Sequence, residues 1–229
     1  MTATETARIE SGSAGEPDDY GLPAEPSWRE VDWPSQVRRL TIDDASVAYV
    51  DDGAGAGPPL VLIHGHGGRW RNWLENIPAL SRDRRVVALD LPGFGDSEMP
   101  VEDISISGYA RVVDRLCERL GLGPVAMAGN SMGGFVAAEL AVAFPERVEH
   151  LVLATPAGMV PAARDRDVRL IPGARSHVLA DTGHIPLVER PRTLNRSLLE
   201  FLDAAGCAAG DGPLRAGLSA LNRKSCPHH

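Results

Sequence analysis

The chain of 229 residues is poor in basic charge, cysteine and aromatic side chains, and it has no long apolar run. Its net charge is -8, which argues against nucleic acid as a partner because binding to phosphates requires a basic surface. No apolar run approaches the roughly 20 residues that span a bilayer, so no membrane association is expected. The acidic N-terminus also lacks the apolar region of a secretory signal. The three cysteines show no metal-ligand spacing and are typical of free thiols in a reducing compartment, so we expect a cytoplasmic protein.

The composition predicts a single domain between two less ordered ends. Hydrophobic residues make up 43% and charged residues 24% of the chain, as in ordinary globular proteins. Residues 1–32 carry eight acidic side chains against two arginines, so we interpret 1–33 as an acidic, disordered arm. Within this arm, Trp28 and Trp33 leave a docking segment open as an alternative. We assign 34–205 to the domain and 206–229 to a loosely ordered tail.

Short apolar runs alternate with segments of helical periodicity along the predicted domain. This alternation predicts an α/β fold with a mainly parallel sheet that helices cover on both faces. A hairpin turning at Asp43 and Asp44 comes first, and an apolar run of four residues is typical of a strand buried on both faces. The hairpin strands are 37–42 and 46–50, the buried strands are 60–63, 86–89, 125–128, 151–154 and 176–179, and the helices are 73–80, 109–120, 134–144 and 192–203.

The segment Gly129-Asn130-Ser131-Met132-Gly133 joins a predicted buried strand directly to a predicted helix. A nucleophile elbow requires this context, because its serine occupies a strained turn and needs small residues two positions away on each side. The N-terminus of the following helix favours negative charge near the serine. Ser131 is therefore the candidate nucleophile, and the Met132 amide is a candidate donor to an oxyanion.

Two further segments follow strands that end at the same edge of the sheet. The run His64-Gly65-His66-Gly67-Gly68 can direct a backbone amide at the space above Ser131. No carboxylate or cysteine accompanies its histidines at ligand spacing, so no metal is expected. His184, within Asp181-Thr182-Gly183-His184-Ile185-Pro186, is the candidate general base because it follows the last predicted strand.

These segments together resemble the α/β-hydrolase fold superfamily. The similarity lies in LVLIHGHGG, VVALDLPGFGDS, VAMAGNSMGGFVAAELA, VEHLVLATPAG and VLADTGHIPLVERP, which cover most of 60–202 in the family's order. GNSMGG with NWLENIPAL is similar to the serine-dependent branch of meta-cleavage product (carbon–carbon bond) hydrolases and esterases. This resemblance implies Ser131 as nucleophile, His184 as base and the amides of His66 and Met132 as the oxyanion hole, without a cofactor.

The acid of the expected triad must lie between Ser131 and His184, since the family's order is serine, acid, histidine. Glu139, Glu146 and Glu149 belong to the helix after the elbow or to the far edge of the sheet, and Asp181 is too close in sequence to the base. Two candidates remain, Asp165 and Asp167. We prefer Asp165, because Ala163–Val168 resembles the family's segment for this residue.

The stretch 154–175 is too short for the family's helical cap together with a further central strand, since one βαβ unit takes about 30 residues. We therefore expect a truncated fold that lacks the cap and one core strand. Three hypotheses follow: a compact serine hydrolase acting on small esters, a carbon–carbon bond hydrolase relative with altered activity, or a domain with little or no catalysis. The sequence does not identify the substrate or the oligomeric state.

Overall fold

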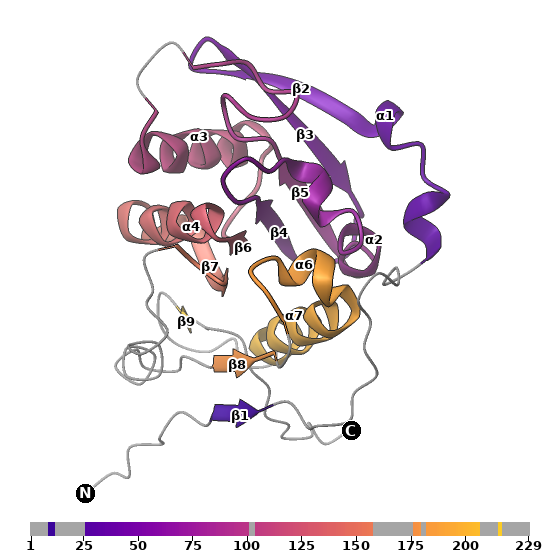
Figure 1. The fold of residues 1–229 in the computed structure, drawn as a ribbon. Helices are drawn as coiled ribbons and strands as arrows, with labels where there is room; N and C mark the ends of the chain where they lie inside the picture. Colours follow the sequence, from indigo (N-terminus) through magenta and orange to yellow (C-terminus); the bar gives the residue numbers. More distant parts are fainter. Residues whose placement is uncertain are drawn as a thin grey trace, which may run out of the picture.

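A seven-stranded sheet forms the centre of the molecule in the computed structural model, which describes residues 9–11, 26–100, 104–157, 176–179, 182–206 and 215–216. The strands lie in the order β2-β3-β5-β4-β6-β7-β9, and Figure 1 shows the helices on both sides of them. Their bounds are β2 Val37–Ile42, β3 Ala45–Asp52, β4 Gly57–Ile63, β5 Arg84–Leu89, β6 Val125–Asn130, β7 Val148–Ala154 and β9 Arg215–Ala216.

The sheet is antiparallel at one side and parallel elsewhere. Strands β2 and β3 form the expected hairpin, and β3 also pairs antiparallel with β5. Asp43 and Asp44 make the turn at φ 49° and 65°, the left-handed conformations that tight hairpin turns require. The remaining pairs, β5-β4, β4-β6, β6-β7 and β7-β9, are all parallel. The carboxyl ends of β5, β4, β6 and β7 therefore meet at one edge, called the C-terminal edge below.

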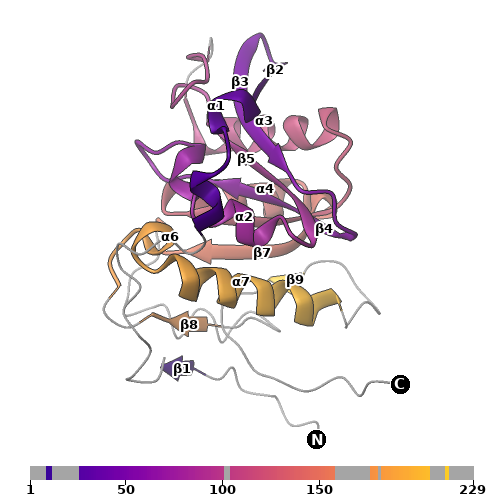
Figure 2. The same cartoon turned by 90° about the vertical axis from the view of Figure 1, so that its right-hand side faces the viewer.

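Successive side chains of the central strands enter two separate cores, as the two-residue period of a strand requires. Val61 and Ile63 pack under α3 (Ile106–Arg119) and α4 (Met132–Ala143). Leu60 and Leu62 pack in the second core, which contains residues of α1 (Trp33–Gln36) and of four further helices. These are η2 (Trp70–Trp73), α2 (Ile77–Leu80), α6 (Pro186–Glu189) and α7 (Pro191–Gly206), and Figure 2 shows α7 running alongside β7.

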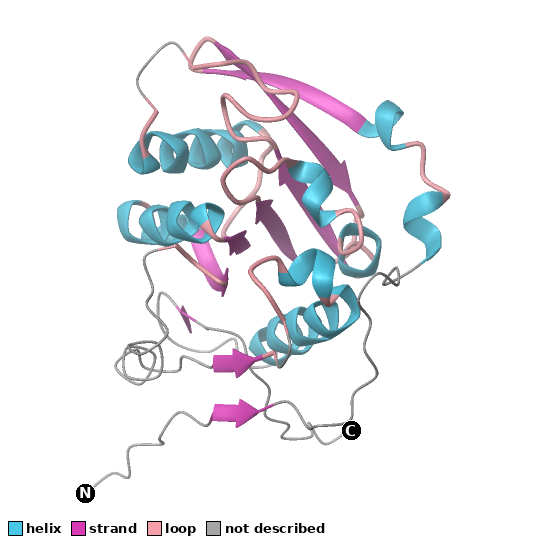
Figure 3. Ribbon diagram, in the orientation of Figure 1, coloured by secondary structure: helices cyan, strands magenta, loops and turns pink. Residues whose placement is uncertain are grey.

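Two predicted elements differ from the structure. The helix expected over 73–80 is divided into η2 and α2 (Figure 3), since Pro78 lacks an N–H and is accommodated in the first turn of α2. The last strand exists as β8 (Ser176–Val178), but it pairs with β1 (Ile9–Ser11) in a separate two-stranded sheet. Its expected place in the central sheet was wrong, because local apolar character does not specify which strand becomes the neighbour.

Both tryptophans of the acidic N-terminal segment contact the rest of the protein. Trp33 begins α1 (Trp33–Gln36), is buried and lies 5.7 Å from Trp70 between ring centroids. Its Nε1 donates to the carbonyl oxygen of Trp28, which lies in η1 (Pro26–Arg29). This segment covers part of the second core. The limits 1–33, 34–205 and 206–229 remain predictions.

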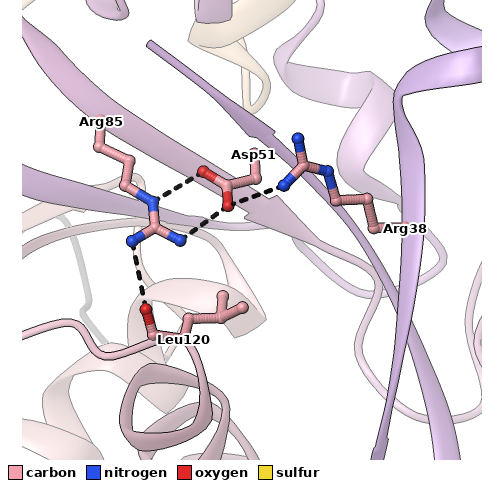
Figure 4. A network of polar contacts seen from close by, with 4 residues as sticks. All are labelled: Arg38, Asp51, Arg85 and Leu120. Carbon is pink, nitrogen blue, oxygen red and sulfur yellow. Dashed lines mark hydrogen bonds and ion pairs between the residues drawn. The ribbon is translucent and has the colours of Figure 1, made fainter. Parts of the chain in front are cut away.

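A charged network fastens the hairpin to the parallel strands at the end opposite the C-terminal edge (Figure 4). Asp51 accepts from Arg85 Nε at 2.8 Å and Nη2 at 2.7 Å, and from Arg38 Nη1 at 3.5 Å. Arg85 Nη1 also donates to the carbonyl oxygen of Leu120 after α3. The hydrogen bond with Asp51 raises the pKa of Arg85. Through these bonds to Asp51 and Leu120, Arg85 links its own strand β5 to β3 and to the end of α3.

No described helix combines the length and apolar character needed to cross a membrane.

Candidate active site

Ser131 occupies a strained turn between the end of β6 and the start of α4. Its backbone angles are φ 52° and ψ -116°, a combination that L-residues rarely adopt and that costs about 1–3 kcal/mol. The Ser131 amide donates to the carbonyl oxygen of Ala154 at the end of β7. The serine is thus held at the C-terminal edge, in the geometry that a nucleophile elbow requires.

The glycines around Ser131 are required by close contacts between main-chain atoms. A Cβ on Gly129 would lie 2.2 Å from the carbonyl oxygen of Gly133. A Cβ on Gly133 would lie 2.4 Å from the carbonyl oxygen of Ile63, at the end of β4. The strand, the elbow and the helix can approach this closely only without side chains at both positions.

His184 faces Ser131 across the C-terminal edge. Its Nε2 lies 2.8 Å from the Ser131 Oγ, which is hydrogen-bond distance. The main-chain carbonyl of His184 accepts from Asn130 Nδ2 at 3.1 Å and from Thr155 Oγ1 at 2.8 Å. The base predicted from sequence therefore lies beside the predicted nucleophile, and its backbone is fastened to the ends of β6 and β7.

The glycine-rich turn after β4 lies against the elbow. A Cβ on Gly65 would be 3.1 Å from the Ser131 Cβ, so the turn passes within contact distance of the serine. Met132 is the first residue of α4, and its amide has no helical partner for that reason. Within the described ranges, neither the Met132 amide nor the His66 amide donates a hydrogen bond to the protein. Both have the hydrogen-bonding capacity that an oxyanion hole needs.

His64 has a structural position behind this turn. It is fully buried, its Nε2 accepts from the Leu91 amide at 3.0 Å, and its Nδ1 lies 2.7 Å from the Gly65 carbonyl oxygen. Because the Leu91 N–H must donate to Nε2, the proton of the neutral ring is on Nδ1, which donates to Gly65. Burial lowers the pKa of His64. The ring therefore braces the turn in its neutral form.

The side chain of His66 is exposed and packs edgewise on Phe94, with 5.7 Å between centroids. Among the residues that the structure describes, no three histidine, cysteine or carboxylate side chains gather as a metal site would require.

The predicted acids Asp165 and Asp167 lie outside the described residues, as does Asp181. Of the other carboxylates weighed from sequence, Glu146 and Glu149 are exposed around the start of β7, at the edge opposite Ser131. Among the described side chains, no carboxylate oxygen pairs with the His184 ring. The acid stays a prediction.

Sequence reasoning missed three side chains that hold residues 182–185, called the histidine loop below: Asn130, Thr155 and Glu189. Glu189 accepts from the amides of Gly183 and Ile185, at 2.6 Å and 2.9 Å. Asn130 directly precedes the elbow serine, and Thr155 directly follows β7. The position of Asn130 and Thr155 at strand ends on the C-terminal edge was the signal in the sequence that could have identified them, because strand ends converge at this edge.

The comparisons with known proteins agree on the fold. The family model described as alpha/beta hydrolase fold matches residues 58–169. The crystal structure of a membrane phospholipase A, a bacterial virulence factor, superposes with a TM-score of 0.66 over 82% of this chain and 94% of that chain. At 24% identity, this likeness concerns the fold alone.

Curated relatives share part of their length with this chain. The dihydrolipoyllysine-residue acetyltransferase component of the acetoin cleaving system of Pseudomonas putida is 36% identical over 65% of this chain and 40% of its own length. The 2-hydroxymuconate semialdehyde hydrolase of a Pseudomonas species is 40% identical over 46% of this chain and 39% of its own length. The chain thus spans about two fifths of these relatives.

Proposed function

Because the chain belongs to the α/β-hydrolase fold superfamily, we propose that it is a serine hydrolase that cleaves a small ester or related acyl substrate. The observation that carries this proposal is the 2.8 Å contact between Ser131 Oγ and His184 Nε2, made at an elbow with φ 52°. A serine within hydrogen-bond reach of an imidazole is the arrangement that activates a hydroxyl as a nucleophile.

The first half of the reaction forms an acyl-enzyme. His184 Nε2 takes the hydroxyl proton as Ser131 Oγ attacks the substrate carbonyl carbon. The amides of His66 and Met132 stabilise the negative oxygen of the tetrahedral intermediate. When the intermediate collapses, the bond to the leaving alcohol breaks and His184 returns the proton to that alcohol.

The second half returns the free enzyme. His184 removes a proton from water, and the resulting nucleophile attacks the ester carbonyl carbon on Ser131. The bond between that carbon and Ser131 Oγ then breaks, the carboxylic acid leaves, and His184 returns the proton to Ser131 Oγ. Asp165 is proposed to hold the His184 ring in the required tautomer, with Asp167 as the alternative. Loss of this group costs about 10⁴-fold in a well-studied protease.

The described residues contain no cap domain over the C-terminal edge, and His184 is exposed. An exposed base of this kind suits a small-molecule substrate, and the proposed reaction needs no cofactor.

Cleavage of a carbon–carbon bond is the second candidate function, favoured by the 40% identity to 2-hydroxymuconate semialdehyde hydrolase. A ring-fission semialdehyde would separate the candidates, because carbon–carbon cleavage releases a dienoate and a carboxylic acid from it. A domain with little catalysis would act on neither substrate.

Hydrolysis of p-nitrophenyl butyrate by the parent protein and by Asp165→Asn and Asp167→Asn tests the proposal. We expect an active parent, a loss of at least tenfold in Asp165→Asn, and a rate close to the parent in Asp167→Asn. The reverse pattern would move the role to Asp167. If the parent is active and neither variant is impaired, both aspartates are excluded as the acid of the triad. An inactive parent would contradict the proposed function.

A further inference from the structure

The carboxylate of Glu189 holds the two residues on either side of His184. Glu189 Oε2 accepts from the Gly183 amide at 2.6 Å, and Oε1 accepts from the Ile185 amide at 2.9 Å. Hydrogen bonds to an ionised carboxylate are stronger than those between neutral groups. Both oxygens of one side chain thus restrain the backbone at the candidate base.

This contact differs from an ordinary helix cap. Ile185 precedes α6, and a glutamate a turn later that binds the first free amide is a common way to begin a helix. The second bond reaches Gly183, which lies outside α6 and on the far side of His184. Starting the helix does not require that bond.

The histidine loop depends on such contacts because its preceding strand stands apart from the central sheet. β8 pairs with β1, whereas β6 and β7 pair with each other within the sheet. The carbonyl of His184 is attached to the ends of β6 and β7 through Asn130 and Thr155. Glu189 supplies the opposing restraint on the amide side.

We propose that Glu189 is a positioning residue, which keeps the His184 ring at hydrogen-bond distance from Ser131. This inference rests on the proposed function, since it assigns Glu189 a part in the same reaction. A glutamine at 189 retains one acceptor oxygen and places an NH₂ group against the other amide. The loop would then shift, and a displacement of about 1 Å at a reacting group can cost 10²-fold in rate.

Gly183 provides an independent way to disturb the same contact. A Cβ at this position would lie 2.7 Å from Glu189 Oε2 and 2.8 Å from Oε1. Gly183→Ala must therefore displace the carboxylate. Because the two substitutions remove one interaction, the double variant should lose scarcely more activity than either single variant.

The experiment compares Glu189→Gln with the parent, using Glu146→Gln as a matched control. Glu146 is exposed in η3 (Pro145–Arg147), at the opposite edge of the sheet. For p-nitrophenyl butyrate, we expect kcat to fall roughly tenfold or more in Glu189→Gln. KM, the melting temperature and the final stoichiometry of fluorophosphonate labelling should stay close to the parent. The control should match the parent in every measurement.

If the parent is active and Glu189→Gln has the same kcat, the positioning role is overturned and the proposed function stays intact. So would a kcat loss that follows a lowered melting temperature and a reduced labelled fraction, because that pattern indicates a purely structural role. Additive losses in the double variant with Gly183→Ala would also contradict it. A parent that neither hydrolyses the ester nor accepts the label would overturn both proposals.

Discussion

Three glycine-to-alanine substitutions should separate loss of activity from loss of folding, since the space available to the new methyl group differs in steps. Nothing lies within 4 Å of a Cβ at Gly123; at Gly65 the nearest atom is the Ser131 Cβ at 3.1 Å. At Gly133 a backbone oxygen of Ile63 lies 2.4 Å away. We expect Gly123→Ala to be neutral, Gly65→Ala to be folded but impaired, and Gly133→Ala to be destabilised.

The magnitudes follow from these distances. Carbon atoms pack best at about 3.5–4.0 Å, so Gly65→Ala must move the turn or Ser131 by a few tenths of an ångström. Because about 1 Å of misplacement can cost 10²-fold, we expect a loss of roughly tenfold in kcat. In Gly133→Ala, two main-chain segments must separate, and overpacking of this kind costs about 3 kcal/mol or more. That cost corresponds to a fall of about 6–12 °C in the melting temperature of a domain of this size.

The melting temperature and the rate of p-nitrophenyl butyrate hydrolysis, measured on the same preparations, separate loss of folding from loss of activity in these three variants. Gly65→Ala should melt close to the parent and hydrolyse the ester slowly, and Gly123→Ala should match the parent in both assays. Full activity in Gly65→Ala would refute the placement of this turn against Ser131. A melting temperature in Gly133→Ala equal to that of the parent would refute the tight contact between elbow and β4.

Three further predictions concern groups away from the reacting atoms. Burial raises the pKa of Cys117 to about 12; with the other cysteines replaced by serine, a thiol reagent should modify the protein only after denaturation. A native Cys117 thiol that reacts readily at neutral pH would contradict this burial. The free energy of unfolding should also fall between about pH 9 and 12, because the thiol of the unfolded chain ionises at a lower pH than the buried thiol. Burial lowers the pKa of His64 from 6.5, so the free energy of unfolding should fall as the pH drops below that value and the unfolded chain takes up the proton. Denaturant titrations at about pH 7.5 and 5 should show a smaller fall in His64→Gln, and equal falls would exclude this linkage. Asp51→Asn should lower the free energy of unfolding by about 2 kcal/mol, because it weakens the hydrogen bonds to Arg85. The denaturant midpoint should fall while the rate of ester hydrolysis stays unchanged. A reduced rate in folded Asp51→Asn protein would contradict the separation of this charged network from the active site.

The sequence was most informative where local pattern determines structure. The buried strands follow from short apolar runs, the hairpin from Asp43 and Asp44, and the elbow from small residues around Ser131. The placement of Ser131 at the C-terminal edge follows from the common direction of parallel strands, whereas His184 lies there although the strand before it, β8, is outside the central sheet. Each of these depends on neighbours in sequence or on a general rule of topology.

Features that depend on contacts between distant segments were not predictable in the same way. The apolar character of β8 gave no indication that it pairs with β1. The contacts of His184 with Asn130 and Thr155 join residues 54 and 29 positions apart. The hydrogen bonds of Glu189 with the Gly183 and Ile185 amides join residues close in sequence, but a glutamate at the start of a helix is ordinarily interpreted as a cap. Such features depend on how chain segments meet in space.

The most direct test of Ser131 as the nucleophile is covalent labelling with a fluorophosphonate, followed by intact-mass measurement and peptide mapping. We expect one adduct on the parent protein, located on Ser131, and none on a Ser131→Ala variant that melts at the parent's temperature. Undiminished labelling of the folded Ser131→Ala variant, or an unlabelled parent, would contradict it.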